Sequence, residues 1–225
     1  MKNFFNRKII RTEDGSHSFY LPDLDEHYHS IHGAVQESKH VFMEMGWKKV
    51  SENKGEVVVL EIGFGTGLNV FLLRKELWKR HVKVWYTTIE AYPLSAEEAE
   101  GVNYFTEEGE QDSFSILHRA KWNEPVQLYP NNDFVLEKIH TTLEDFIPTP
   151  EKYDLVFFDA FSPDKQPELW TEEVFRKLFS AMKSGGMLVT YCAKGQVRRN
   201  MQAVGFIVER LEGPPGKREM LRARK

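Results

Sequence analysis

The chain has 225 residues, of which 41% are hydrophobic and 28% charged, and its formal net charge is −4 at pH 7. These values favour one globular domain, or one with an appendage, and exclude fibrous and disordered chains. No apolar run approaches the roughly 20 residues of a membrane span, and the start lacks a signal-peptide core. We therefore expect a cytoplasmic protein that does not contact the membrane. The single cysteine, Cys192, excludes an internal disulfide.

The first 54 residues are polar and rich in turn-forming residues, and we interpret them as an N-terminal extension of strands and a helix. The stretch "TEDGSHSFY" (residues 12–20) predicts a hairpin. "AVQESKHVFMEMGW" (residues 34–47) carries apolar residues at helical spacing and predicts a helix. A turn-like segment at 51–56 then marks the boundary between residues 1–54 and a second part, residues 55–225.

Residues 55–225 alternate between strand-like and helix-like patterns. Runs of β-branched and aromatic residues predict strands at 57–62, 82–91, 133–142, 153–161 and 185–193. Helical spacing of apolar residues predicts helices at 67–80, 95–100, 171–186 and 195–205. Thr171 is the expected N-cap of the third helix, and glycines are expected to end it.

The last two predicted strands, at 206–211 and 217–223, have no helix between them and therefore predict an antiparallel hairpin. Strands that alternate with helices form parallel sheets covered on both faces. The sequence thus predicts an α/β fold with a mostly parallel seven-stranded sheet, an antiparallel C-terminal hairpin and the N-terminal extension.

A glycine-rich loop, "EIGFGTGLN", follows the first strand of this second part. Gly63, Gly65 and Gly67 allow a tight turn and the close approach of a ligand. A dinucleotide fingerprint reads G-x-G-x-x-G, whereas this loop reads G-x-G-x-G with Glu61 just before it. An acid there repels a pyrophosphate but can pair with an ammonium group. The charge therefore favours S-adenosylmethionine over NAD as the cofactor.

A second acid supports this interpretation. Glu90 ends the next strand, where a carboxylate can accept hydrogen bonds from both ribose hydroxyls. The loop, the two acids and the strand positions together predict a class I, Rossmann-like methyltransferase domain at residues 55–225. The alternative is that the glycines serve only the packing of helix against strand.

A further carboxylate follows the buried run "LVFF" in the segment "FFDAFSPDKQPELW". Asp159 is expected at the carboxyl end of a central strand, facing the same crevice as the glycine loop. A buried acid must be satisfied by a ligand, a backbone N–H group or a substrate. The alternative is that Asp159 caps a neighbouring turn. Trp170, taken alone, is more typical of a core residue than of a stacking surface.

Charge is distributed unevenly along the chain. Residues 194–225 hold nine Lys or Arg and three Glu, whereas residues 90–112 hold eight acids and no base. The basic tail can bind a polyanion or can simply be a solvated surface. The acidic segment is interpreted as a solvated helical face. His27, His29 and His32 lack matched carboxylates, so no metal site is expected.

The stretches "EIGFGTGLN", "FFDAFSPDKQPELW" and "SGGMLVTYCAKGQVRRNMQAVGFIVERLEGPPGKREML" resemble the methyltransferase domain of the MnmC family, which modifies the wobble uridine of tRNA. The resemblance covers about residues 10–223, and the N-terminal quarter matches more loosely. Because the chain ends soon after "KREM", it resembles the stand-alone, MnmD-like form, so neither an oxidase domain nor its FAD is expected. No obligate protein partner is expected either.

This resemblance implies transfer of a methyl group from S-adenosylmethionine to the amine of 5-aminomethyl-2-thiouridine in the tRNA anticodon stem-loop. Asp159 is then the expected residue at the reaction centre. The expected cofactor-binding residues are Glu61, Gly63, Gly65, Thr66, Gly67, Asn69, Glu90, Thr142 and Leu143. The expected substrate and tRNA contacts are Phe161, Trp170, Lys194, Arg198, Arg199, Lys217 and Arg218.

One position departs from the family pattern. Thr142 stands in "HTTLEDF" where the family has an acid near the adenine, so Thr142, the Leu143 backbone or Glu144 is expected to make that contact. Two other functions remain open: a methyltransferase for a small-molecule amine, and a catalytically silent module that binds S-adenosylmethionine and RNA. An NAD-dependent oxidoreductase is disfavoured by the glycine spacing.

Overall fold

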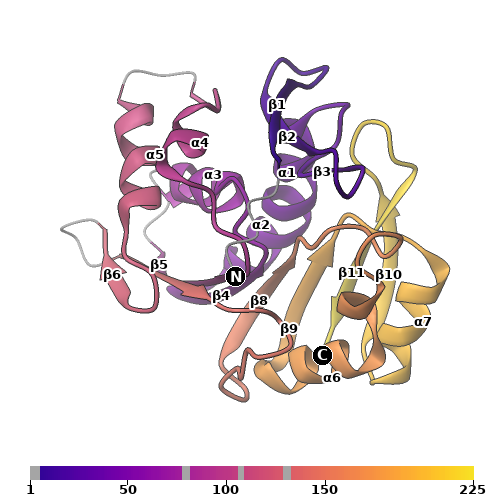
Figure 1. The fold of residues 1–225 in the computed structure, drawn as a ribbon. Helices are drawn as coiled ribbons and strands as arrows, with labels where there is room; N and C mark the ends of the chain where they lie inside the picture. The colour runs from indigo at the N-terminus through magenta and orange to yellow at the C-terminus, as the bar shows by residue number, and fades with distance from the viewer. Residues whose placement is uncertain (1–5, 78–81, 106–108, 129–132) are drawn as a thin grey trace.

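The computed structural model describes residues 6–77, 82–105, 109–128 and 133–225 (Figure 1). Its main sheet has the strand order β10-β11-β9-β8-β4-β5-β7-β6. The five central strands run parallel: β4 (Glu56–Ile62), β5 (Lys83–Glu90), β7 (Phe134–His140), β8 (Tyr153–Phe158) and β9 (Met182–Thr190). The strands β10 (Ile207–Glu212) and β11 (Glu219–Arg224) form the antiparallel hairpin. The predicted mostly parallel α/β fold is confirmed.

Among the residues that the structure describes, the sheet has eight strands rather than seven, because a short strand, β6 (Pro125–Gln127), pairs antiparallel with β7 at the other edge. Three residues that begin with proline show no periodicity, so the sequence did not indicate this strand.

Helices cover both faces of the sheet, and β4 shows why. Val57 and Val59 point into one core, whereas Val58 and Leu60 point into the other, as side chains alternate along a strand. On the first face lie α3 (Leu68–Leu77) and α5 (Glu110–Arg119); on the second lie α6 (Glu172–Ala181) and α7 (Gly195–Ala203). The short helix α4 (Ala96–Glu100) follows β5.

Two helix predictions need correction. The helix α6 begins as predicted, with the Thr171 side chain accepting a hydrogen bond from the Val174 N–H group. It ends at Ala181, however, and the two glycines lie inside β9, where Gly185 has a φ of 75° at an irregularity in the pairing with β8. The helix α5, in contrast, was not predicted: only its first residues fall in the acidic segment 90–112, which was interpreted as a solvated helical face, and few of its side chains are buried.

Residues 6–54 contain a small sheet and a long helix. The strands β1 (Lys8–Arg11), β2 (His17–Leu21) and β3 (Glu26–His27) pair antiparallel, which confirms the predicted hairpin. The predicted helix is also confirmed and runs through α1 (Ala34–Ser38), a π-helical segment η1 (Lys39–Trp47) and α2 (Lys48–Ser51).

This long helix packs directly on the main sheet. The ring centroids of Phe42 and Phe157 lie 5.2 Å apart, and a Cβ atom at Gly46 would lie 2.9 Å from the Val189 side chain. The extension therefore shares the core of the main sheet. No helix within the described ranges is long and apolar enough to cross a membrane.

Candidate active site

A cavity of about 500 Å³ opens at the carboxyl ends of β4, β5, β7 and β8. The strand order reverses between β4 and β8, which is where open α/β sheets bind their ligands. Its volume falls in the usual range for small-molecule sites. Of the residues expected from the sequence, the cavity wall contains Gly63, Gly65, Asn69, Glu90, Thr142, Leu143, Asp159 and Phe161.

The glycine loop brings β4 and β8 into close contact. Gly63 has a φ of 91°, and a Cβ atom on it would lie 2.6 Å from the Asp159 carbonyl oxygen. The N–H groups of Gly63 and Phe64 donate to the Ile89 carbonyl at 3.1 and 3.2 Å, which joins the loop to the end of β5. Glycine at position 63 is therefore required both by its backbone conformation and by the space available.

Glu90 fixes the other side of the loop. Its Oε2 atom accepts a hydrogen bond from the Gly65 N–H group at 2.9 Å, and Oε1 accepts one from the Tyr92 N–H group at 2.8 Å. Each carboxylate oxygen can accept a further hydrogen bond. Glu90 is thus positioned at the cavity wall with capacity to bind two hydroxyl groups.

Asp159 lies at the end of β8, where its Oδ2 atom accepts a hydrogen bond from the Asn69 side chain at 2.8 Å. Burial raises the pKa of Asp159 to about 7, and the charge of Glu37 adds to this effect. The Asn69 hydrogen bond and the charge of Lys217 oppose it. A carboxyl group with a pKa near 7 can exchange a proton at neutral pH.

Glu61 does not line the cavity, which corrects the prediction that it pairs with a ligand ammonium group. Its side chain is 0% exposed, and its Oε2 atom accepts a hydrogen bond from the Thr88 hydroxyl at 2.7 Å. Burial raises the pKa of Glu61 to about 8, although the Thr88 hydrogen bond lowers it. Glu61 is therefore a buried residue next to the glycine loop and is not part of the cavity wall.

Thr66 and Gly67 also lie outside the cavity wall. Thr66 is 1% exposed, and its carbonyl oxygen is 3.0 Å from the Nε2 atom of His118. A Cβ atom on Gly67 would lie 2.9 Å from the same imidazole. These two residues shape the turn into α3 rather than contact a ligand.

The segment after β7 forms the part of the wall assigned to the adenine. The Thr142 hydroxyl donates to Asp145 at 2.9 Å and accepts from the Asp145 N–H group at 3.1 Å, so it caps a local turn. Leu143 is 4% exposed, and Glu144 also lines the cavity. Thr142 therefore makes local hydrogen bonds, and Leu143 and Glu144 line the same part of the cavity wall.

The two aromatic residues expected near the substrate have different environments. Trp170 is 2% exposed, donates a hydrogen bond from Nε1 to the Phe161 carbonyl at 2.8 Å and packs on Phe158. Because it is a core residue, the prediction that it stacks against a base is wrong. Phe161 does line the cavity, and the centroids of its ring and the Tyr28 ring lie 5.2 Å apart with the two rings nearly perpendicular.

Three of the five basic residues expected to contact tRNA lie around a second depression. Its wall includes Lys194, Lys217, Arg218 and Tyr191. Lys194 pairs with Asp164, and Lys217 pairs with the buried carboxylate of Glu37, so both cations are already balanced. Lys217 also lies 3.8 Å from the centre of the Tyr191 ring. Arg218 is exposed.

The other two expected tRNA contacts are on α7. Arg199 is exposed and donates to the Gln196 side chain at 2.8 Å. Arg198 is only partly exposed, and its Nε atom is buried. Of the five cations, Lys194, Arg199 and Arg218 are exposed, and Lys194 is paired with Asp164.

Sequence reasoning missed the contribution of the N-terminal extension to this cavity. Tyr28 and the buried His29 both line it, as does Tyr92 in the loop after β5. The aromatic and histidine content of "DEHYHS" was the available signal, but without the fold nothing indicated that this segment reaches the sheet. Within the described ranges, no three His, Cys, Asp or Glu residues are arranged to hold a metal ion.

Comparison with known proteins agrees with this geometry. A family model described as S-adenosyl-L-methionine-dependent methyltransferase matches residues 112–225. This chain belongs to that methyltransferase family. It is therefore an enzyme that uses S-adenosylmethionine, and the predicted class I, Rossmann-like fold and cofactor are confirmed.

Relatives of this methyltransferase are named tRNA 5-methylaminomethyl-2-thiouridine biosynthesis bifunctional protein MnmC. The one from Actinobacillus pleuropneumoniae serotype 5b is 31% identical over 223 residues, which cover 88% of this chain and 32% of the relative. The one from Cupriavidus metallidurans is 30% identical over 230 residues, covering 96% and 33%. The methyltransferase thus spans about a third of the length of these curated relatives, and its resemblance to the MnmC methyltransferase domain is confirmed.

Solved structures give the same result. MnmC2 from Aquifex aeolicus matches with a TM-score of 0.80 and 25% identity, covering 99% of this chain and 71% of the other. Spermidine synthase from Thermotoga maritima matches with a TM-score of 0.58 and 16% identity, covering 98% and 73%. The second match shows a shared fold only.

Proposed function

We propose that this methyltransferase transfers a methyl group from S-adenosylmethionine to the primary amine of 5-aminomethyl-(2-thio)uridine at the wobble position of tRNA. The product is the 5-methylaminomethyl nucleoside. The observation that carries the proposal is the Asp159 carboxyl group beside the glycine-loop cavity, with its pKa near 7. The tRNA modification named in the curated relatives supports the choice of substrate.

The cavity residues fit S-adenosylmethionine. Gly63 and Gly65 line the cavity with backbone and carry no side chain, and Glu90 offers two carboxylate oxygens to ribose hydroxyls. Leu143 provides an apolar surface for the adenine ring. The cofactor supplies a methyl group on a sulfonium centre, which a neutral amine displaces in line.

Asp159 has two tasks in this reaction. Its carboxylate can accept a hydrogen bond from the substrate amine and so orient the nitrogen lone pair toward the methyl carbon. As the N–C bond forms and the S–C bond breaks, the nitrogen must lose a proton, and we assign its acceptance to Asp159, which lines the cavity. The hydrogen bond from Asn69 holds the carboxylate in place.

Of the two aromatic residues expected to stack, Phe161 is the one that lines the cavity. It lines the cavity next to Asp159, whereas Trp170 is buried beneath it. A base splayed out of the anticodon loop commonly stacks on an exposed aromatic ring. We therefore assign base stacking to Phe161 and contacts with tRNA phosphates chiefly to Arg199 and Arg218.

A second candidate function is methylation of a small-molecule amine. The ion pairs of Lys194 and Lys217 favour it, because they leave fewer free cations for phosphates than the sequence suggested. The same Asp159 chemistry would apply, so the two functions differ only in the acceptor and in the salt dependence of its binding.

The test is to incubate the protein and S-adenosylmethionine with tRNA that carries 5-aminomethyluridine and to analyse the nucleosides by mass spectrometry. We expect conversion to the methylaminomethyl nucleoside by the unaltered chain and by Asp164→Ala, a matched change of an exposed acid on the same loop. Asp159→Ala is expected to lower turnover at least 100-fold while changing cofactor affinity little, on the scale of general acid–base catalysis. Cofactor binding without conversion would reject tRNA as the acceptor.

A further inference from the structure

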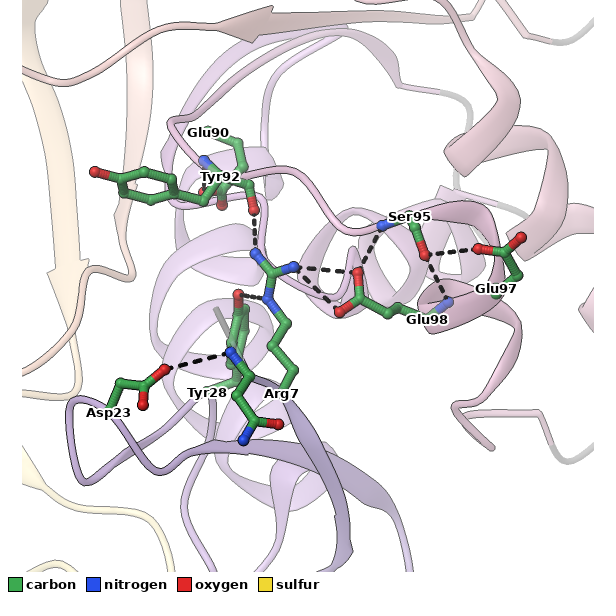
Figure 2. Close-up of polar contacts among 9 residues, drawn as sticks. Arg7, Asp23, Tyr28, Glu90, Tyr92, Ser95, Glu97 and Glu98 are labelled. Atoms are coloured by element: carbon green, nitrogen blue, oxygen red, sulfur yellow. Dashed lines mark hydrogen bonds and ion pairs between the residues drawn. The ribbon is translucent and has the colours of Figure 1, made fainter. Parts of the chain in front are cut away.

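Figure 2 shows Arg7 in polar contact with Tyr28, Tyr92 and Glu98. Its Nε atom donates to the Tyr28 hydroxyl at 2.9 Å, and its Nη2 atom donates to the Tyr92 carbonyl at 2.6 Å. Its Nη1 atom donates to both carboxylate oxygens of Glu98, at 3.2 and 3.1 Å. One guanidinium group thus joins the segment before β1 to the residue after β3, to the loop after β5 and to α4.

Two of these partners are part of the cavity wall. Tyr28 lies against the glycine loop, since a Cβ atom on Gly65 would be 3.2 Å from the Tyr28 ring. The Tyr92 N–H group donates to Glu90, the acid that also holds Gly65. Arg7 therefore acts on both residues that border the loop, although Arg7 itself is not among the residues lining the cavity.

The third partner makes this connection rigid. Glu98 also accepts a hydrogen bond from the Ser95 N–H group at 2.8 Å, which completes a capping box at the start of α4. The Arg7 side chain is 6% exposed and that of Glu98 is 28% exposed, so their ion pair is partly shielded from water. A planar guanidinium with several donors in fixed directions holds such a geometry, whereas a lysine ammonium does not.

We propose that Arg7 is a positioning residue for cofactor binding: it holds Tyr28 and the Tyr92 loop in the arrangement that closes the cavity over S-adenosyl compounds. Without Arg7, the Tyr28 hydroxyl and the Tyr92 carbonyl lose their shared donor, and the rim must become ordered when the ligand binds. That ordering reduces affinity. The inference depends on the cavity as the cofactor site and not on the identity of the methyl acceptor.

The test measures binding of S-adenosylhomocysteine by isothermal titration calorimetry, so it needs no methyl acceptor. We expect Arg7→Ala to weaken binding about tenfold and Tyr28→Phe, which removes one acceptor, about threefold, in line with loss of charge-assisted hydrogen bonds. The double variant should bind no more weakly than Arg7→Ala, because the two residues act through one contact. Arg7→Lys should restore little of the loss. The control is Arg11→Ala, an exposed arginine in β1, which should bind normally.

Hydrogen exchange distinguishes positioning from general stability. In Arg7→Ala without ligand, amides near Tyr28 and Tyr92 should exchange faster, while those of β4 and β8 keep their protection. Affinity equal to that of Arg11→Ala would overturn the proposal. It would also be overturned by an equal loss of protection throughout β4 and β8, since that indicates a global loss of stability. No binding by the unaltered chain would instead reject the cavity as the cofactor site.

Discussion

Replacing Gly63 with alanine tests the close approach of the glycine loop to Asp159. Alanine at a φ of 91° costs about 1–2 kcal/mol for the left-handed backbone. The new Cβ atom would also lie 2.6 Å from the Asp159 carbonyl oxygen, and such overpacking costs about 1–3 kcal/mol more. The sum of about 2–5 kcal/mol is a large part of the usual stability of a domain and corresponds to a fall in Tm of about 4–20 °C.

The same change should reduce activity beyond its effect on stability. The clash is with backbone, so either the loop or the end of β8 must move, and a displacement near 1 Å can lower turnover on the order of 100-fold. Thermal denaturation and methyl-transfer assays on the purified variant, at a temperature where it remains folded, measure the two effects separately.

Two other glycines separate backbone strain from the clash. Gly185 has a φ of 75°, and an added Cβ atom there would have no neighbour within 4 Å, so Gly185→Ala should show the strain alone. Gly55 has open space and no positive φ, so Gly55→Ala should leave Tm unchanged or slightly raised. If Gly63→Ala is no less stable than Gly185→Ala, the assignment of Gly63 to a steric role is refuted.

Three further predictions concern charge. The kcat/KM of the unaltered enzyme should rise with pH through about 7, the pKa of Asp159, because only the carboxylate form accepts a proton. The pH profile of Asp159→Asn should lack this rise. A rise that persists in this variant would contradict the role of Asp159 as proton acceptor. The pKa of Glu61 is raised from 4.5 to about 8, so the folded chain retains a proton that the unfolded chain releases, and stability is lost as pH rises across that range. Denaturant titrations measure the free energy of unfolding, and that of Glu61→Gln should rise by about 3 kcal/mol relative to that of the unaltered chain between pH 5 and 8. A difference between the two free energies that does not change with pH would exclude this pKa. Arg218→Gln should reduce by about 1 the slope of a plot of the logarithm of the tRNA-binding constant against the logarithm of the salt concentration. The control Lys48→Gln removes a cation that pairs with Glu44 and should leave this slope unchanged. Equal slopes for the two variants would argue against a phosphate contact at Arg218.

The parts of the fold that the sequence predicted are those with strong local signals. The buried run in β4, the helical spacing of α3 and the Thr171 cap each depend on residues close together in the chain. The positions of Glu90 and Asp159 followed from the same rule, since the carboxyl ends of parallel strands meet at one edge of the sheet. The short strand β6 has no such signal, because its pairing with β7 is a tertiary effect.

The roles of individual side chains were harder to predict because they depend on contacts between distant segments. Spacing placed Glu61 beside the loop, but only the fold shows that it points to Thr88 inside the core. Lys217 is basic in the sequence, yet its charge is balanced by Glu37, 180 residues away. The same reasoning explains why Tyr28 went unnoticed: its place in the cavity depends on Arg7 and on the loop after β5. A sequence pattern thus predicts a site residue that lies at the end of a strand, as Glu90 and Asp159 do. It does not predict a residue such as Tyr28, which reaches the site from a segment far away in the sequence.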